Sequence, residues 1–143
     1  MGKVNVLLVD DEEAFVDALT RRLSRRKLDV KSVYNGQDAL DALGKDRLLE
    51  VVILDVKRPG LDGIETLKRI KTEFPLVEVI MLTGHATVES AIEGMKLGAF
   101  DYLMKPCDID DLVAKVDQAA ARKQVHEEKI TQARIKEITI RGR

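Results

Sequence analysis

The chain has 143 residues, which fits one compact domain of about 120 residues with a short extension and excludes a two-domain enzyme. Its 24 Lys and Arg nearly balance 25 Asp and Glu, so no field of one sign draws the whole molecule to nucleic acid or to a membrane. The charge is unevenly spread, since residues 122–143 carry 7 basic and 3 acidic side chains and residues 1–121 have a net charge of −5. A single cysteine excludes an internal disulfide, and the lack of a signal peptide or a long apolar run predicts a cytoplasmic protein.

Five short apolar runs alternate with five segments of helical period. The runs lie at 4–9, 29–33, 51–54, 77–82 and 100–103, and the last helical segment starts at Ile109 and continues to about Ile138. Nearly continuous apolar runs are typical of strands buried on both faces of a parallel sheet. The pattern predicts an α/β fold of the doubly wound (βα)5 type with an extended C-terminal helix. By fold analogy, we expect its five-stranded parallel sheet to have the flavodoxin-like order 2-1-3-4-5.

Polar side chains follow the predicted strands at the edge where open α/β sheets bind their ligands. Asp10 and Asp11 follow the first strand, Asp55 the third, Thr83 the fourth and Lys105 the fifth. Three carboxylates at one edge repel one another unless a cation lies between them. Mg²⁺ prefers oxygen ligands, so Asp10 or Asp11 together with Asp55 suits it, whereas the sequence has no Cys-His cluster for a softer metal.

The same residues predict a site for phosphoryl transfer. The ammonium of Lys105 and the hydroxyl of Thr83 can hold the oxygens of a phosphoryl group beside the metal. Asp55, alone at the end of the central strand, is the candidate nucleophile. A single strand-terminal Asp is often only a turn residue or a helix N-cap, as Asp11 could be. Five such residues at one predicted edge favour the site.

Three segments of the sequence resemble the receiver domain of bacterial two-component response regulators. They are VLLVDDEEAF, VVILDVKRPGLDGIETL and VIMLTGHATVESAIEGMKLGAFDYLMKP, and the resemblance extends over residues 3–121. It implies that Asp55 accepts a phosphoryl group from a sensor histidine kinase or phosphotransfer protein, and that Mg²⁺ binds Asp10, Asp11, Asp55 and the backbone carbonyl of Lys57.

The resemblance also implies how phosphorylation changes the surface that a downstream protein binds. Thr83 and Lys105 match the conserved Thr and Lys of the family, and Tyr102 matches its switch aromatic. Movement of Thr83 and Tyr102 would change the surface of the fourth helix, fifth strand and fifth helix, where a downstream protein effector binds. The Lys105–Pro106 bond is expected to be cis. Arg58 departs from the family, which usually has Met there, and this places partner recognition in doubt more than phosphorylation.

Two positions are expected to set the lifetime of the phosphorylated state. In the family, the residues two after the acceptor and two after the switch Thr flank the path of the hydrolytic water, and here these are Lys57 and His85. Both are bulky, so we expect a lifetime on the order of tens of minutes to hours. The opposing interpretation is that a neutral His85 acts as a general base and speeds hydrolysis.

The sequence predicts a receiver domain at 1–121 and a charged helical extension at 122–143. The extension carries a thin apolar stripe made of Val125, Ile130, Ala133 and Ile138. This stripe is too narrow for a strong coiled coil, so we expect a partly frayed helix that contributes to a weak or phosphorylation-linked homodimer. The sequence shows no effector domain, so the expected output is through protein contacts, without direct binding of nucleic acid or a membrane.

Other interpretations stay open at this point. The chain could be the receiver fragment of a larger transcriptional activator. A Mg²⁺-dependent aspartyl phosphatase also uses an Asp at a strand end, although no cap domain fits this length. A flavodoxin-like cofactor binder shares the fold but needs a Ser/Thr-rich phosphate loop after the first strand, where this sequence is acidic.

Overall fold

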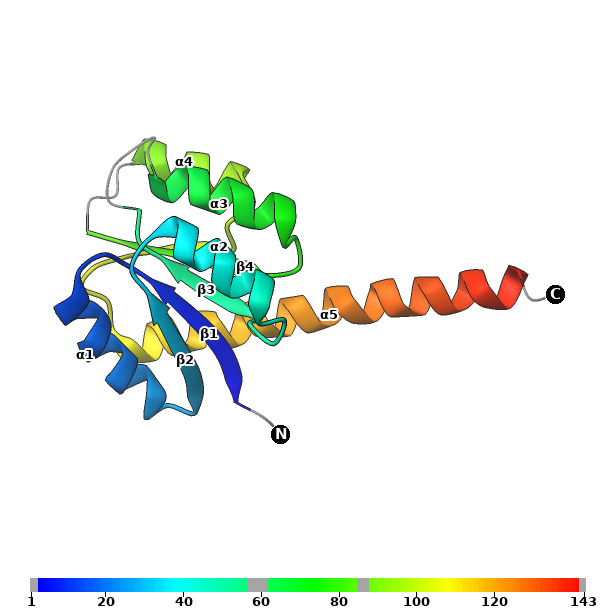
Figure 1. Ribbon diagram of the computed structural model, residues 1–143, viewed down its shortest axis with the longest axis horizontal. Helices are drawn as coiled ribbons and strands as arrows, with labels where there is room; N and C mark the ends of the chain where they lie inside the picture. Colours follow the sequence, from blue (N-terminus) through cyan, green and yellow to red (C-terminus); the bar gives the residue numbers. More distant parts are fainter. Residues whose placement is uncertain (1–2, 57–61, 85–87, 142–143) are drawn as a thin grey trace.

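Strands and helices alternate along the chain in the computed structural model, which describes residues 3–56, 62–84 and 88–141 (Figure 1). The strands are β1 (Val4–Val9), β2 (Leu28–Val33), β3 (Val51–Leu54), β4 (Glu78–Thr83) and β5 (Asp101–Met104). The helices are α1 (Glu13–Ser24), α2 (Gly36–Lys45), α3 (Asp62–Glu73), α4 (Val88–Lys96) and α5 (Ile109–Arg141). The alternation confirms the predicted α/β fold.

The strands form one parallel sheet in the order β2-β1-β3-β4-β5, as predicted. Val9 at the end of β1 lies beside Val33 of β2 and Leu54 of β3, so the strands end level with one another. We call the edge where the strands end the carboxyl edge, and the edge where they begin the amino edge. The residues that follow the strands therefore meet at the carboxyl edge.

Alternating side chains of the central strands build two apolar cores. Leu7, Val52 and Val79 face one core, which α2 and α3 cover, whereas Leu8, Ile53 and Ile80 face the other, which α1 and α5 cover (Figure 1). All six of these side chains are buried. Burial on both faces explains why the strands read as continuous apolar runs.

Some boundaries differ from the prediction by one or a few residues. Strand β4 includes Thr83, which is its last residue rather than the first residue after it, and β5 ends at Met104. Helix α5 continues to Arg141 without a break. Element ends depend on hydrogen bonds to neighbouring strands and turns, which apolar periodicity does not record.

Helix α4 lies close to β4 because it carries a glycine at the contact. A Cβ atom at Gly94 would clash with the terminal methyl group and the sulfur of the buried Met81. The turn after the helix contains Gly98, whose φ of 103° suits glycine, and Ala99 donates its N–H to the carbonyl of Gly94. On the opposite face, three apolar side chains are exposed: Val88, Ile92 and Met95.

A buried carboxylate lies at the amino edge. Glu78, the first residue of β4, is 3% exposed. Lys71 of α3 donates to Glu78 Oε1 at 3.0 Å and to the carbonyls of Pro75 and Val77, each at 2.9 Å. Nε of Arg122 lies 3.1 Å from Glu78 Oε2. This cluster links α3, β4 and α5 on the side of the sheet away from the carboxyl edge.

Helix α5 begins against the sheet and then projects beyond it (Figure 1). Leu112, Val116 and Ala119 are fully buried, whereas every described side chain from Glu128 onward is exposed. None of the described helices combines the length and the apolar composition that a membrane span requires.

Candidate phosphoryl-transfer site

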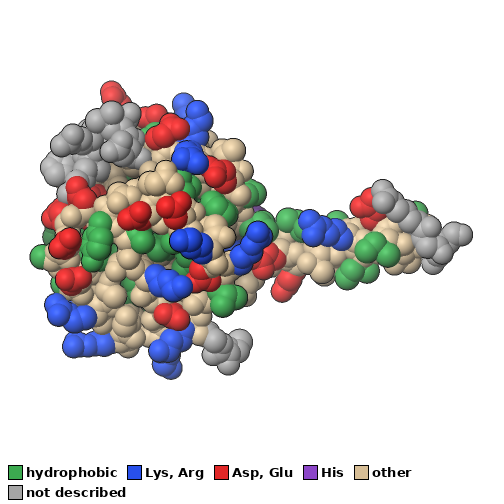
Figure 2. Space-filling model, in the orientation of Figure 1, with side chains coloured by type: hydrophobic (Ala, Val, Ile, Leu, Met, Phe, Trp, Pro, Cys, Tyr) green, Lys and Arg blue, Asp and Glu red, His purple; other side chains and the backbone are tan. Residues whose placement is uncertain are grey.

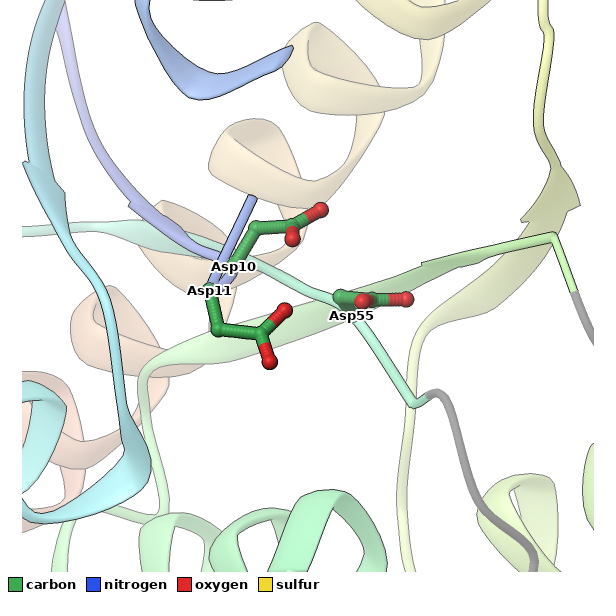
Figure 3. A group of neighbouring side chains, drawn as sticks. All are labelled: Asp10, Asp11 and Asp55. Atoms are coloured by element: carbon green, nitrogen blue, oxygen red, sulfur yellow. The ribbon is translucent and has the colours of Figure 1, made fainter. Parts of the chain in front are cut away.

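Three carboxylates gather at the carboxyl edge (Figure 3). Asp10 and Asp11 follow β1 and Asp55 follows β3, and one oxygen atom from each lies within 4.8 Å of the others. Backbone bonds hold the supporting chain, since Asp55 N–H donates to the Val9 carbonyl at 3.0 Å and Asp10 N–H donates to the Val33 carbonyl at 3.3 Å. The predicted convergence of these three residues is therefore present.

Asp10 is the most deeply placed of the three. It is 3% exposed, and its Oδ1 accepts the N–H of Glu12 at 2.9 Å, which shapes the turn into α1. The N-cap residue of α1 is Glu12, whose side chain makes no capping hydrogen bond. Asp11 is exposed and is not the N-cap, so this alternative for Asp11 is wrong.

Lys105 places an ammonium among these carboxylates. Its Nζ donates to Asp10 Oδ2 at 2.6 Å and lies 3.5 Å from Asp55 Oδ2 and 3.7 Å from Glu12 Oε1. The ammonium also lies 4.2 Å from the centre of the Phe15 ring, a cation–π contact that the sequence did not indicate. The Lys105–Pro106 bond is cis, as expected. Among the residues that the structure describes, one cation thus faces several carboxylates, so negative charge is in excess there.

Thr83 lies one strand further along the same edge. Its side chain is buried, and its hydroxyl donates to the carbonyl of Val56 at 2.6 Å. Tyr102 in β5 is partly buried and packs against the core beneath α2 and α3. The Thr83 carbonyl accepts the N–H of Lys105 at 2.9 Å, so the ends of β4 and β5 are joined at the site.

Gly63 is a site residue that sequence reasoning missed. It lies in the first turn of α3, and a Cβ atom there would lie 2.9 Å from Val56 Cα and 3.1 Å from the Asp55 carbonyl oxygen. Because both contacts are to backbone, a side chain at this position would push α3 away from the segment that carries Asp55. A glycine at the start of a helix is a weak signal, since many such glycines have no packing role.

The donor set fits a hard divalent cation. Carboxylate oxygens are the ligands that Mg²⁺ takes in proteins, and the three side chains lie close enough together to share one ion. Lys57 and His85 fall outside the described residues, so the roles predicted for the Lys57 carbonyl and for both side chains stay predictions.

Residues 6–117 match the response regulator receiver domain family. The transcriptional regulatory protein ZraR of Salmonella typhimurium is 38% identical over 120 residues, which cover 84% of this chain and 27% of that protein. The crystal structure of a response regulator receiver domain protein from Clostridium thermocellum has a TM-score of 0.79 at 33% identity, covering 85% of this chain and 98% of that one.

A further similar structure is that of a response regulator protein from Burkholderia pseudomallei with a phosphorylated aspartic acid, calcium ion and citrate. It has a TM-score of 0.73 at 29% identity and covers 87% of this chain and 73% of that one. The chain spans between 25% and 29% of the length of the curated relatives it matches.

Proposed function

Because the chain belongs to the response regulator receiver domain family, we propose that it is a phosphorylation-driven switch in which Asp55 accepts a phosphoryl group beside Mg²⁺. The observation that carries this proposal is the cluster of Asp10, Asp11 and Asp55 with the Lys105 ammonium among them. The Burkholderia relative, which holds a phosphorylated aspartic acid and a calcium ion, supports both the acceptor chemistry and the divalent cation. Family membership favours this function over the aspartyl phosphatase and the flavodoxin-like binder.

The charge balance of the site explains the need for a cation. Asp10, Asp11 and Asp55 would hold Mg²⁺, which when bound supplies positive charge that offsets the carboxylates and the incoming phosphoryl group. Without added positive charge, several carboxylates around one ammonium repel a phosphoryl dianion. Lys105 lies between Asp10 and Asp55, so a small movement from Asp10 would bring its ammonium to a phosphoryl oxygen on Asp55.

The proposed chemistry is an in-line displacement at phosphorus. A carboxylate oxygen of Asp55 forms the new O–P bond, while the bond between phosphorus and the donor breaks and the donor keeps the electron pair. With a phosphohistidine donor the leaving atom is an imidazole nitrogen, and with an acyl phosphate it is a carboxylate oxygen. Lys105 and Thr83 position the phosphoryl oxygens, so the residues act by orientation and charge.

The Thr83 hydroxyl is the proposed first part of the switch. It donates to the Val56 carbonyl, and a phosphoryl oxygen on Asp55 offers it a stronger, charged acceptor nearby. Exchange of these acceptors would draw Thr83 toward Asp55 and leave room for Tyr102 to turn inward. These movements would then alter the surface next to the exposed apolar face of α4, which consists of Val88, Ile92 and Met95.

The proposed partners follow from this scheme. A sensor histidine kinase or a phosphotransfer protein supplies the phosphoryl group, and a downstream protein effector reads the surface of α4, β5 and α5. We propose that residues 1–121 form the receiver domain and that residues 122–143 form an extension, which contributes to a weak or phosphorylation-linked homodimer. The alternative function is that of a receiver domain within a larger transcriptional activator. The similarity to ZraR, a transcriptional regulatory protein, supports this alternative.

Bulky side chains at Lys57 and His85 are proposed to lengthen the phosphorylated state. Loss of label over time should be slow in the wild type, on the order of tens of minutes to hours, and faster in Lys57→Asn. Marked slowing in His85→Ala would instead show that His85 acts as a base.

Labelling with an acyl phosphate tests the acceptor. In the presence of Mg²⁺ we expect one acid-stable, base-labile phosphoryl group per chain, which Asp55→Asn abolishes and a chelator prevents. Asp117→Asn is the matched control, because Asp117 is an exposed aspartate on α5, and its labelling should equal that of the wild type. Labelling that persists in Asp55→Asn would refute the assignment.

A further inference from the structure

The projecting part of α5 carries a regular seam of side chains. From the body outward, every third or fourth residue lies on one face: Leu112, Val116, Ala119, Lys123, His126, Ile130, Ala133, Glu137 and Ile140. The first three are buried against the sheet, and Lys123 is still only 12% exposed. The outer members include Ile130, which is 40% exposed, and Ile140, which is 73% exposed. The spacing is that of a coiled-coil seam.

This seam differs from the apolar stripe expected from the sequence. At 3.6 residues per turn, Val125 and Ile138 lie roughly 140° apart around the helix and cannot share a partner. Ile130, Ala133 and Ile140 do share a face, together with the polar residues His126 and Glu137. The polar members of the seam therefore decide which arrangement a second copy of the helix can adopt.

In a parallel pair of these helices, each polar seam residue would face the same residue of the second copy. Lys123 would face Lys123, His126 would face His126 and Glu137 would face Glu137, and like charges in neighbouring positions destabilise helix pairs. An antiparallel pair removes this conflict. With the two-fold axis between residues 131 and 132, His126 lies beside the partner's Glu137, and Ile130 lies beside the partner's Ala133.

The flanking charges are compatible with a weak antiparallel pair. Glu127 comes near the partner's Arg134, which is attractive, while Lys129 comes near the partner's Lys136, which is repulsive. The larger asymmetry lies between the ends of the molecule. Residues 133–143 carry 4 basic and 1 acidic side chain, whereas residues 1–121 have a net charge of −5.

Figure 2 shows acidic and basic side chains interspersed on the visible face of the body, and basic, acidic and apolar side chains along the projecting helix. An antiparallel pair brings the basic distal end of each helix toward the body of the other copy, whose residues 1–121 have a net charge of −5. A parallel pair would place body beside body and basic end beside basic end.

We propose that residues 123–140 of α5 pair antiparallel with the same segment of a second copy, with His126 beside the partner's Glu137. This inference deepens the homodimer of the proposed function and rests on it, but it does not depend on phosphorylation of Asp55. The paired segment is about 26 Å long. Ile130 and the partner's Ala133 supply the apolar seam contacts, and Ile140 lies beside the aliphatic stem of the partner's Lys123. The pair is therefore weak, and the two bodies lie at opposite ends of the rod.

Spin-label distances test the direction of pairing in the full chain. In a Cys107→Ser background, single nitroxides are attached at Gln124→Cys, Gln132→Cys or Thr139→Cys, all of them exposed positions. An antiparallel dimer gives a short distance between two labels at 132. Labels at 124 and at 139 are each separated by about 22 Å along the axis.

Short distances between the two labels at all three positions would mean a parallel dimer. That result would overturn this inference but would still support the homodimer. A chain that stays monomeric in both the phosphorylated and unphosphorylated forms would overturn both. Neither result bears on the acceptor role of Asp55, which the labelling experiment tests separately.

A charge exchange provides the second test. His126→Glu places a carboxylate against the partner's Glu137, and we expect the dissociation constant of the dimer to rise about tenfold. Addition of Glu137→His should restore the wild-type value, because it places an imidazole beside a carboxylate again at both antiparallel contacts. The spin-label distances, and not this exchange, decide the direction of pairing. Gln124→Glu is the control, since it adds one negative charge off the seam and should change the constant little. A double variant that stays as weak as His126→Glu would contradict the pairing.

Discussion

The two edges of the sheet hold ion clusters with opposite balances of charge. At the carboxyl edge, the ammonium of Lys105 lies among the carboxylates of Asp10, Asp55 and Glu12. At the amino edge the relation is reversed, because the carboxylate of Glu78 lies between Lys71 and Arg122. An excess of carboxylates attracts a further cation, whereas a carboxylate matched by two cations needs none.

The edges also differ in how the charges are held. The Glu78 side chain is 4% exposed, and its partners come from two helices on opposite faces of the sheet. At the carboxyl edge, Asp11 is exposed and Gly84 beside Lys105 is exposed too. The same kinds of side chain thus form an open ligand site at one edge and a closed structural link at the other.

The largest effect is expected from removing Lys105, the cation that pairs with the carboxylates of the carboxyl edge among the described residues. Lys105→Met should lower the rate of phosphorylation by an acyl phosphate roughly 100-fold to 1000-fold, since it removes one positioned donor to the phosphoryl group. The matched control is Lys71→Met, which removes the corresponding cation of the amino edge. Its phosphorylation rate should stay close to that of the wild type, and an equal loss in both variants would break the distinction between the edges.

The amino edge should respond in stability instead. Glu78→Gln leaves two cations without their buried carboxylate, and we expect the free energy of unfolding to fall by about 2 kcal/mol. The loss is moderated because the Arg122 side chain is 53% exposed and can be hydrated. Urea denaturation measures this change. The control Glu73→Gln breaks an exposed pair with Arg69 and should cost at most about 0.5 kcal/mol.

A glycine substitution tests whether the carboxyl edge also depends on close packing. Gly63→Ala should lower the free energy of unfolding by about 1–2 kcal/mol, because its Cβ would meet the backbone of Asp55 and Val56. The control is Gly44→Ala in α2, where nothing lies within 4 Å of an added Cβ. That substitution should stabilise the protein by up to about 1 kcal/mol through helix propensity. An unchanged Gly63→Ala variant would show that α3 can shift without cost.

The smallest effect is expected from an exposed ion pair that belongs to neither of these two clusters. Lys31 donates to Asp46 at 2.6 Å, and this bond, with the Leu48 N–H, holds the pKa of Asp46 below its usual value. A lowered pKa stabilises the fold at pH above the unfolded value, and the contribution is lost as the pH falls through the folded value.

Carboxyl NMR titration of Lys31→Met measures this effect. The pKa of Asp46 should move up but stay below the usual value, because the Leu48 N–H remains. Lys129→Met, on the distal part of α5, should leave it unchanged. A return of the pKa fully to the ordinary value would mean that the backbone donor contributes nothing.

Much of the fold and the candidate site could be predicted because the relevant signals are local. Each apolar run marks a strand, and the polar residue at its end marks the carboxyl edge. A parallel sheet then brings Asp10, Asp11 and Asp55 together whatever the details of packing. The boundary of β4 was missed by one residue because it depends on bonds to the neighbouring strand.

The sequence by itself therefore determined which chemical groups stand at the ligand edge. Only the tertiary structure decided how they are held: the Thr83 hydroxyl on the Val56 carbonyl, the close approach of Gly63, and Glu78 between two helices. Thr83 and Val56 are 27 residues apart in the chain. Such contacts join residues that no local pattern relates, and they exist because close packing of helices on both faces brings particular atoms within hydrogen-bond reach.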